Sequence, residues 1–78
     1  MNVYFLVKID NGAFSVLELG SNKGSICSLM SVYAKRFTDD HDIHTYEETN
    51  DNIVLGYDDG CKAQFSVVSG STEEFFRV

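Results

Sequence analysis

The chain contains no proline and no tryptophan, and it has only two cysteines in 78 residues. Two cysteines are too few for the disulfide scaffold of a small secreted protein, so Cys27 and Cys61 are expected to be buried free thiols. The apolar run at residues 3–7 is far too short for a signal-peptide core or a membrane span, and no basic residue precedes it. We therefore expect a cytoplasmic protein with no membrane attachment.

Basic residues are also scarce. Six Lys and Arg stand against twelve Asp and Glu, which gives a net charge of −6. The imbalance lies in the second half: residues 1–38 hold four basic and two acidic side chains (+2), whereas residues 39–78 hold two basic and ten acidic ones (−8). An array of carboxylates repels the phosphates of DNA and RNA, so direct binding of nucleic acid is not expected.

The remaining composition is that of a folded protein, with 44% apolar residues including six Phe and four Tyr. A chain of 78 residues forms one compact domain, residues 1–78. It is close to the lower size limit for folding without staples, because so small a domain buries only about 60% of its unfolded surface. Dimerisation is therefore an open possibility.

The side chains of residues 3–9 show the alternating pattern of a β-strand. Asn11-Gly12 follows and is a strong signal for a hairpin turn. The pairing expected from a two-residue turn is Ile9 with Phe14 and Val7 with Val16, and on the opposite face Leu6 with Leu17 and Tyr4 with Leu19. Both faces of this hairpin are then apolar, so each is expected to be covered.

After a polar connection at residues 20–24, the apolar spacing changes to that of a helix. The stripe consists of Ile26, Leu29, Met30, Tyr33 and Phe37. Ser25 is a suitable N-cap, and Ser21 or Asn22 are alternatives that would start the helix earlier. Lys35 and Arg36 are expected in the last turn, where the helix dipole favours cations. This helix is predicted to cover one face of the first hairpin.

Residues 38–41 are expected to form a loop, residues 42–48 a weaker strand, and residues 50–52 a turn. Residues 53–57 and 61–68 then form a second hairpin around Asp58-Asp59-Gly60, with Gly60 in the left-handed conformation. The expected register pairs Tyr57 with Cys61, Leu55 with Ala63 and Ile53 with Phe65.

Residues 71–78 fit a helical capping box at Ser71 and Glu74 or a short final strand, and the choice stays open. The fold class is α+β: a small, mostly antiparallel sheet of four to five strands with one amphipathic helix packed on it. The expected order is ββαβββ plus a short C-terminal element.

Three segments resemble reactive or ligand sites without completing one. Residues 39–44 contain Asp and His, which bind divalent metals, but His41 and His44 would lie on opposite sides of a strand and no calcium-loop signature is present. Residues 20–25 lack the spacing of a phosphate-binding loop. Cys27 is predicted in the first helical turn, where a thiol pKa can fall, but no histidine is placed beside it. We predict no catalytic residue, metal site or cofactor.

The acids of the second half have two explanations. Asp favours turns, and charge on edge strands discourages aggregation, so solubility alone could account for them. Alternatively they form a binding face for a basic, nucleic-acid-binding protein, with an aromatic anchor. The predicted partner-binding residues are Asp39, Asp40, Asp42, Tyr46, Glu47, Glu48, Asp58 and Asp59.

The expected function is therefore a non-enzymatic inhibitor that blocks a basic surface of a host protein. In size and charge the chain resembles the small anti-CRISPR and anti-restriction inhibitors that bacteriophages and mobile elements make, a resemblance that covers no motif. Two alternatives remain: an antitoxin or immunity protein with a dedicated partner, and a small homodimeric structural or assembly protein that buries Leu17 and Leu19.

Overall fold

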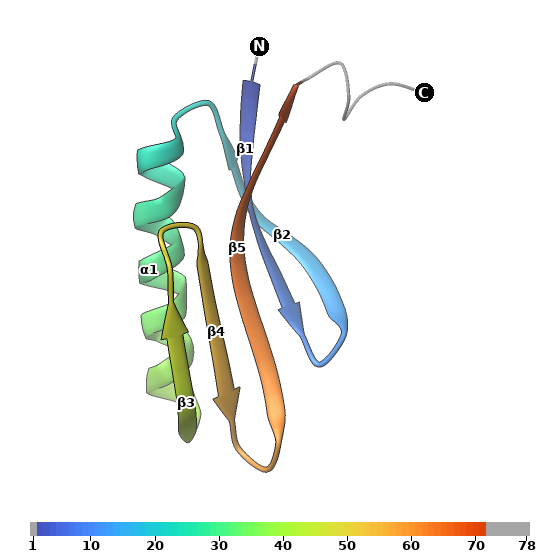
Figure 1. Cartoon of the computed structure of the whole chain (residues 1–78), viewed down its shortest axis with the longest axis vertical. Coiled ribbons are helices and arrows are strands. Elements are labelled where there is room, and N and C mark those ends of the chain that lie inside the picture. The colour runs from blue at the N-terminus through green and yellow to red at the C-terminus, as the bar shows by residue number, and fades with distance from the viewer. Residues whose placement is uncertain (1, 72–78) are drawn as a thin grey trace.

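A computed structural model describes residues 2–71 of the chain, which form one five-stranded antiparallel sheet and one helix (Figure 1). The elements are β1 (Asn2–Asp10), β2 (Ala13–Gly20), α1 (Lys23–Asp40), β3 (Ile43–Glu48), β4 (Asn52–Tyr57) and β5 (Cys61–Ser71). This confirms the predicted α+β fold with the order ββαβββ. The predicted capping box or final strand falls almost wholly on residues 72–78, which lie outside the described residues.

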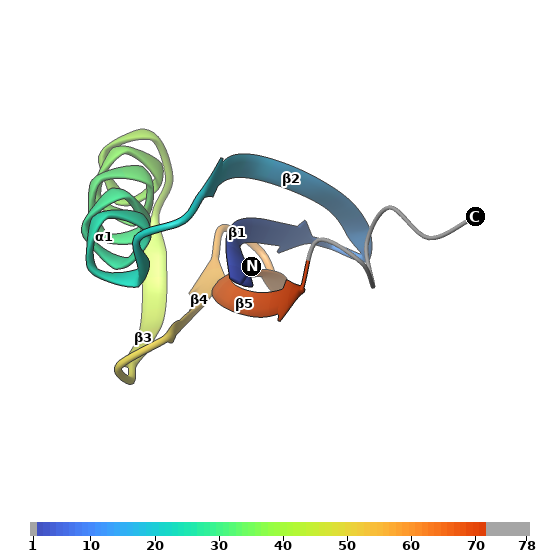
Figure 2. The same cartoon turned by 90° about the horizontal axis from the view of Figure 1, so that it is seen from above.

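The strand order in the sheet is β2-β1-β5-β4-β3, and every neighbouring pair is antiparallel. The last strand therefore pairs with the first and joins the two hairpin regions, which leaves β2 and β3 as the edges. Figure 2 shows α1 lying along one side of the sheet. We call the side that faces α1 the inner face and the opposite side the outer face.

The turn of the first hairpin forms as predicted. Asn11 and Gly12 both have positive φ, at 50° and 85°, as a type I′ turn requires. Next to this turn Ile9 pairs with Phe14 and Val7 with Val16, which confirms the two-residue loop. The right-handed twist of the strands favours this turn type, so Asn-Gly sets the local register.

Beyond Val7 the predicted pairing of β1 and β2 is wrong, because a β-bulge shifts the register. Leu6 lies opposite Glu18 rather than Leu17, and Tyr4 lies opposite Gly20 rather than Leu19. The extra residue in β2 lets Leu17 pack against the core while Glu18 accepts a hydrogen bond from the Tyr33 hydroxyl of α1 at 2.9 Å. Leu19 is thereby turned to the outer face, where it is exposed.

The helix begins at Lys23, three residues before the Ile26 start expected from a Ser25 cap. Asn22 is the N-cap, and its side-chain oxygen accepts a hydrogen bond from the Ser25 amide at 3.0 Å. Asn22 was one of the sequence alternatives, and the earlier start places Cys27 in the second turn. Cys27 and Cys61 are free thiols that are half-buried rather than fully buried. Along residues 2–71, no helix is both long and apolar enough to cross a membrane.

The helix also ends later than predicted, at Asp40, so residues 38–40 are not a loop and Lys35 and Arg36 are not in the last turn. Local contacts support the extra turn. The Thr38 hydroxyl donates to the Lys35 carbonyl at 2.7 Å, and the His41 ring stacks on Phe37 with 4.1 Å between centroids. These contacts offset the unfavourable placement of two aspartates at a helix C-terminus.

The core lies between α1 and the inner face, where each large buried side chain stabilises the fold by roughly 1.5–3 kcal/mol. Its members are Leu6, Ile26, Met30, Ala34, Phe37, Ile53, Leu55, Tyr57, Ala63, Phe65 and Val67. Most of the predicted helix stripe is buried here, with Leu29 and Tyr33 half-buried at its margin. The helix contacts β1 and β2, as predicted, and also β5, so it covers more of the sheet than the first hairpin alone.

The second hairpin forms in the predicted register, with Tyr57 opposite Cys61 and Ile53 opposite Phe65. Gly60 has φ +84°, as expected for the left-handed position of a three-residue loop. The predicted weak strand is β3, which pairs with β4 at the sheet edge. Only its first residue, Ile43, packs against the core, and the rest of β3 is exposed.

Candidate functional site

All eight residues predicted to bind a partner are exposed. Five of them gather at the end of the molecule where α1 stops and the β4–β5 turn lies, at the bottom of Figure 1. We call this group the aspartate end, and it consists of Asp39, Asp40, Asp42, Asp58 and Asp59. The structure thus brings together acids from two segments that are well separated in the sequence.

Backbone contacts between these two segments hold the aspartate end in place. The Asp58 amide donates to the carbonyl of Asp42 at 2.8 Å, and the Asp42 amide donates to the Asp58 carboxylate at 3.2 Å. Asp58 adopts φ +48°, a left-handed conformation that Asp tolerates better than most residues. The β4–β5 turn is therefore tied to the connection between α1 and β3, so the two backbone segments that carry these carboxylates are held next to each other.

Both histidines of this region bind backbone carbonyls. His44 Nε2 lies 2.6 Å from the Asp58 carbonyl and 4.0 Å from the Asp42 carboxylate. His41 Nδ1 lies 3.0 Å from the carbonyl of Phe37. Within residues 2–71, no group of three His, Cys, Asp or Glu side chains is arranged to hold a metal ion. The histidines help to hold the end of the helix and the two loops together.

The other three predicted residues lie on β3 and do not join the aspartate end. Tyr46 and Glu48 share the inner face of the edge strand, and the Tyr46 hydroxyl donates to the Glu48 carboxylate at 2.7 Å. Partial burial and this hydrogen bond raise the pKa of Tyr46 above its ordinary value. Glu47 alternates to the outer face. The predicted set is therefore one cluster and a short segment of edge strand.

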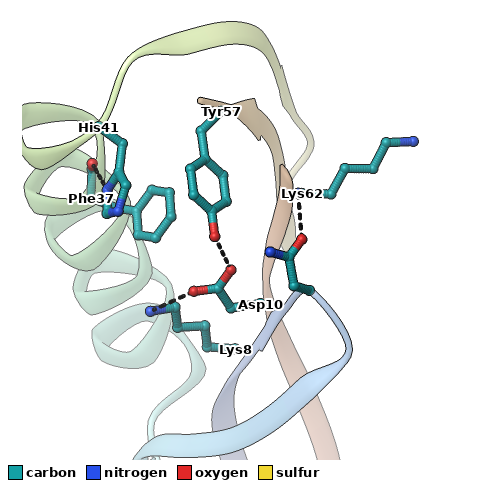
Figure 3. Close-up of polar contacts among 7 residues, drawn as sticks. Lys8, Asp10, Phe37, His41, Tyr57 and Lys62 are labelled. Atoms are coloured by element: carbon teal, nitrogen blue, oxygen red, sulfur yellow. Dashed lines mark hydrogen bonds and ion pairs between the residues drawn. The ribbon is translucent and has the colours of Figure 1, made fainter. Parts of the chain in front are cut away.

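A polar cluster that the sequence did not predict lies beside the core at the same end of the molecule (Figure 3). The Tyr57 hydroxyl of β4 donates a short hydrogen bond to the Asp10 carboxylate of β1. Lys8 Nζ lies 3.7 Å from the other oxygen of Asp10 and 5.0 Å from the centre of the Phe37 ring. The hydrogen bond to Asp10 is the main cause that raises the pKa of Tyr57 to about 12, with burial adding to it.

Lys8, Asp10 and Phe37 also line a shallow groove between α1 and the sheet. The other lining residues are Leu17, Tyr33, Arg36, Asp40, His41 and Phe65. Among residues 2–71, every buried side-chain nitrogen and oxygen has a hydrogen-bond partner. The polar groups of the cluster bind one another, so the cluster serves to connect β1, β4 and the last turn of α1.

One signal of this cluster is present in the sequence. The alternation of β1 places Lys8 and Asp10 on the same face as the core residue Leu6, where charged side chains need partners. The partner Tyr57 is 47 residues away along the chain, and no local pattern links it to Asp10. The cluster therefore becomes visible only in the folded structure.

No family model matches the chain, and neither the curated proteins nor the solved structures compared with it contain a match.

Proposed function

We propose that this chain is a non-catalytic protein-binding domain that inhibits a nucleic-acid-binding protein by covering its basic surface. The aspartate end carries the proposal, because it presents five exposed carboxylates on two segments tied together by hydrogen bonds. Such an array attracts Lys and Arg side chains and repels phosphates, so it selects a surface that normally holds nucleic acid.

The position of Asp39 and Asp40 supports a binding role. They occupy the last turn of α1, which contains no basic residue, and the helix dipole disfavours negative charge there by about 0.3–1 kcal/mol per residue. Acids that served only to fold the chain would be better placed in the first turn, which contains none. Residues that break a local folding rule are concentrated at functional sites.

The edge strand β3 supplies the second part of the proposed surface. Tyr46 is 49% exposed and lies on the inner face beside Glu48. Binding energy in protein interfaces is concentrated in aromatic and Arg anchors, whereas charges mainly set the association rate and the specificity. Tyr46 therefore serves as the anchor. Glu47, on the outer face, adds to the negative electrostatic potential around the site.

The proposed mechanism is occlusion. The carboxylates accelerate encounter with the basic partner, and the bound domain then excludes nucleic acid from the same surface. This action fits an inhibitor of the anti-CRISPR or anti-restriction type, which works in the cytoplasm of a host cell. It needs no reaction and no cofactor.

The test compares two triple variants that change the net charge equally. Replacing Asp39, Asp42 and Asp59 with Asn removes three charges from the aspartate end. The control replaces Asn2, Ser21 and Ser31, which are exposed and outside the proposed surface, with Lys. Both variants have a net charge of −3 instead of −6. Each protein is immobilised and exposed to a cell lysate, and retained proteins are identified by mass spectrometry.

We expect the wild type and the control to retain a nucleic-acid-binding protein that added duplex DNA or RNA displaces. The Asn variant should lose it, and retention by the wild type should fall as salt is raised because exposed charges are screened. Equal retention by the folded Asn variant would refute the proposal. Retention that nucleic acid does not displace would refute the occlusion mechanism.

A further inference from the structure

The outer face of the sheet carries a group of exposed apolar side chains on β1, β2 and β5. Within residues 2–71, no helix or strand covers this face (Figure 2). Its exposed members are Ile9 (37%), Phe14 (64%), Val16 (53%), Leu19 (55%) and Val68 (42%). We call this group the outer patch. Leu19 belongs to it only because of the bulge in β2.

The strand register makes the outer patch continuous. Ile9 lies directly opposite Phe14, and Phe5 of β1 lies between Leu19 of β2 and Val68 of β5. Side chains directly opposite one another on neighbouring strands are in contact distance. A contiguous group of exposed apolar side chains, unlike apolar side chains scattered singly over a surface, is a candidate interaction site.

The charge around the outer patch points to a second copy of the chain as its occupant. The outer positions of β1 and β2 carry no charge, because Lys8, Asp10 and Glu18 all lie on the inner face. Two chains with a net charge of −6 repel each other, so they associate most favourably through a surface without carboxylates. The acids of the aspartate end come from α1, its connection to β3, and the β4–β5 turn.

Neighbouring positions on β4 and β5 extend this surface with uncharged polar side chains. Next to the outer patch, the Gln64 amide and the Ser66 hydroxyl both donate to the side-chain oxygen of Asn52, which forms a neutral polar border. Protein interfaces combine an apolar centre with a polar rim and bury about 800 Å² on each partner. The outer patch supplies the centre, and the polar border supplies part of the rim.

We propose that two copies of the chain pack face to face through the outer patch around a two-fold axis. The two sheets lie about 10 Å apart with their strands inclined by about 30°, as in a β-sandwich. Antiparallel stacking keeps the two aspartate ends at opposite ends of the dimer, where their repulsion is smallest. This inference does not depend on the proposed function.

The test is the mass of the full chain in solution, measured by sedimentation equilibrium from low micromolar to millimolar concentration. We expect a species of twice the 8.7 kDa chain mass. Replacing Phe14 or Val68 with Lys buries a charge in the interface and should raise the dissociation constant of the dimer by at least about tenfold. The matched control is Val32→Lys on α1, which is 46% exposed and should leave the constant unchanged.

Val68→Lys separates packing of the faces from pairing of the edges. Val68 lies on β5, two strands from the β2 edge, so a dimer joined only through β2 would tolerate the change. A wild-type chain that stays monomeric at every concentration overturns the proposal. A dimer that Val68→Lys leaves intact also overturns it, whatever the effect of Phe14→Lys. Circular dichroism of each variant verifies that the fold is retained, and Phe14→Gln offers a milder second change at the same position.

Discussion

The Tyr57 hydroxyl donates a hydrogen bond to the Asp10 carboxylate and so joins β4 to β1 across the strand β5 that lies between them. The bond passes beside Ala63, which pairs with Asp10 and is 1% exposed. The methyl side chain of Ala63 leaves room for the phenol ring above β5. One side chain thus connects the first hairpin with the second.

Ionisation of Tyr57 should destabilise the fold at high pH. Its pKa is raised from 10.0 to about 12, so the folded state holds the proton more tightly than the unfolded state. The resulting stabilisation is complete below pH 10 and is lost as the pH rises through 12. The urea midpoint should therefore fall over this interval, and Tyr57→Phe should show a smaller fall. An equal fall in both proteins would assign the effect to other groups, such as Tyr33 and Tyr46.

Truncating Leu55 tests the core beneath α1. Leu55 is 0% exposed, and Leu55→Ala should lower the free energy of unfolding by about 2–5 kcal/mol because a cavity remains. That is a large part of the 5–15 kcal/mol typical of folded domains. Leu55→Met should cost less than about 1.5 kcal/mol. Urea denaturation measures both, and the exposed Val32→Ala, within about 0.5 kcal/mol of the wild type, is the reference.

The helix start depends on Asn22. Removing its side-chain acceptor in Asn22→Ala should lower the free energy of unfolding by about 0.5–2 kcal/mol, because the Ser25 amide loses its partner. Asn22→Ser keeps an acceptor at the same position and should stay close to the wild type. Thermal unfolding followed by circular dichroism makes the comparison, and equal losses in the two variants would contradict the capping role.

Reversing the charge of Asp40 should stabilise the fold while weakening the proposed binding. Asp40→Lys places a cation at the C-terminus of α1 and should raise the free energy of unfolding by about 0.3–1 kcal/mol at low ionic strength. Salt should diminish the gain by screening. Glu47→Lys, on the outer face of β3, makes the same charge change away from the helix terminus and should bring no such gain. Denaturation in low and high salt tests both.

The β4–β5 turn depends on the backbone of Gly60. Its φ of +84° is disfavoured for a residue with a side chain, although no atom lies within 4 Å of an added Cβ. Gly60→Ala should therefore lower the free energy of unfolding by about 1–2 kcal/mol through backbone strain alone. Gly60→Asn should cost less, since Asn tolerates the left-handed region better. If both variants matched the wild type in urea denaturation, the left-handed conformation would not matter for stability.

Much of the fold could be predicted because the relevant signals are local. Asn11-Gly12 and Asp58-Asp59-Gly60 specify their turns through the φ angles those residues accept, and the turns then set the pairing next to them. The spacing of the helix stripe likewise identified the face of α1 that is buried. The eight candidate binding residues are all exposed, as charged residues and turns generally are.

Other features depend on partners that are distant in the sequence. The bulge at Leu17 and Glu18 exists because α1 offers both a core contact and the Tyr33 hydroxyl. The later end of the helix is a different case, because its supporting contacts are local, between Thr38 and Lys35 and between His41 and Phe37, and they outweigh the preference of the dipole.

The sequence by itself determined the elements, their order, both turns and the acidic character of the second half, because backbone preferences and periodic burial act between near neighbours. Only the tertiary structure decided that β5 pairs with β1, that Asp42 and Asp58 meet, and that Leu19 joins an exposed apolar face. Each of these depends on which strands and loops come together in space, and that choice is set by the packing of the whole sheet against one helix.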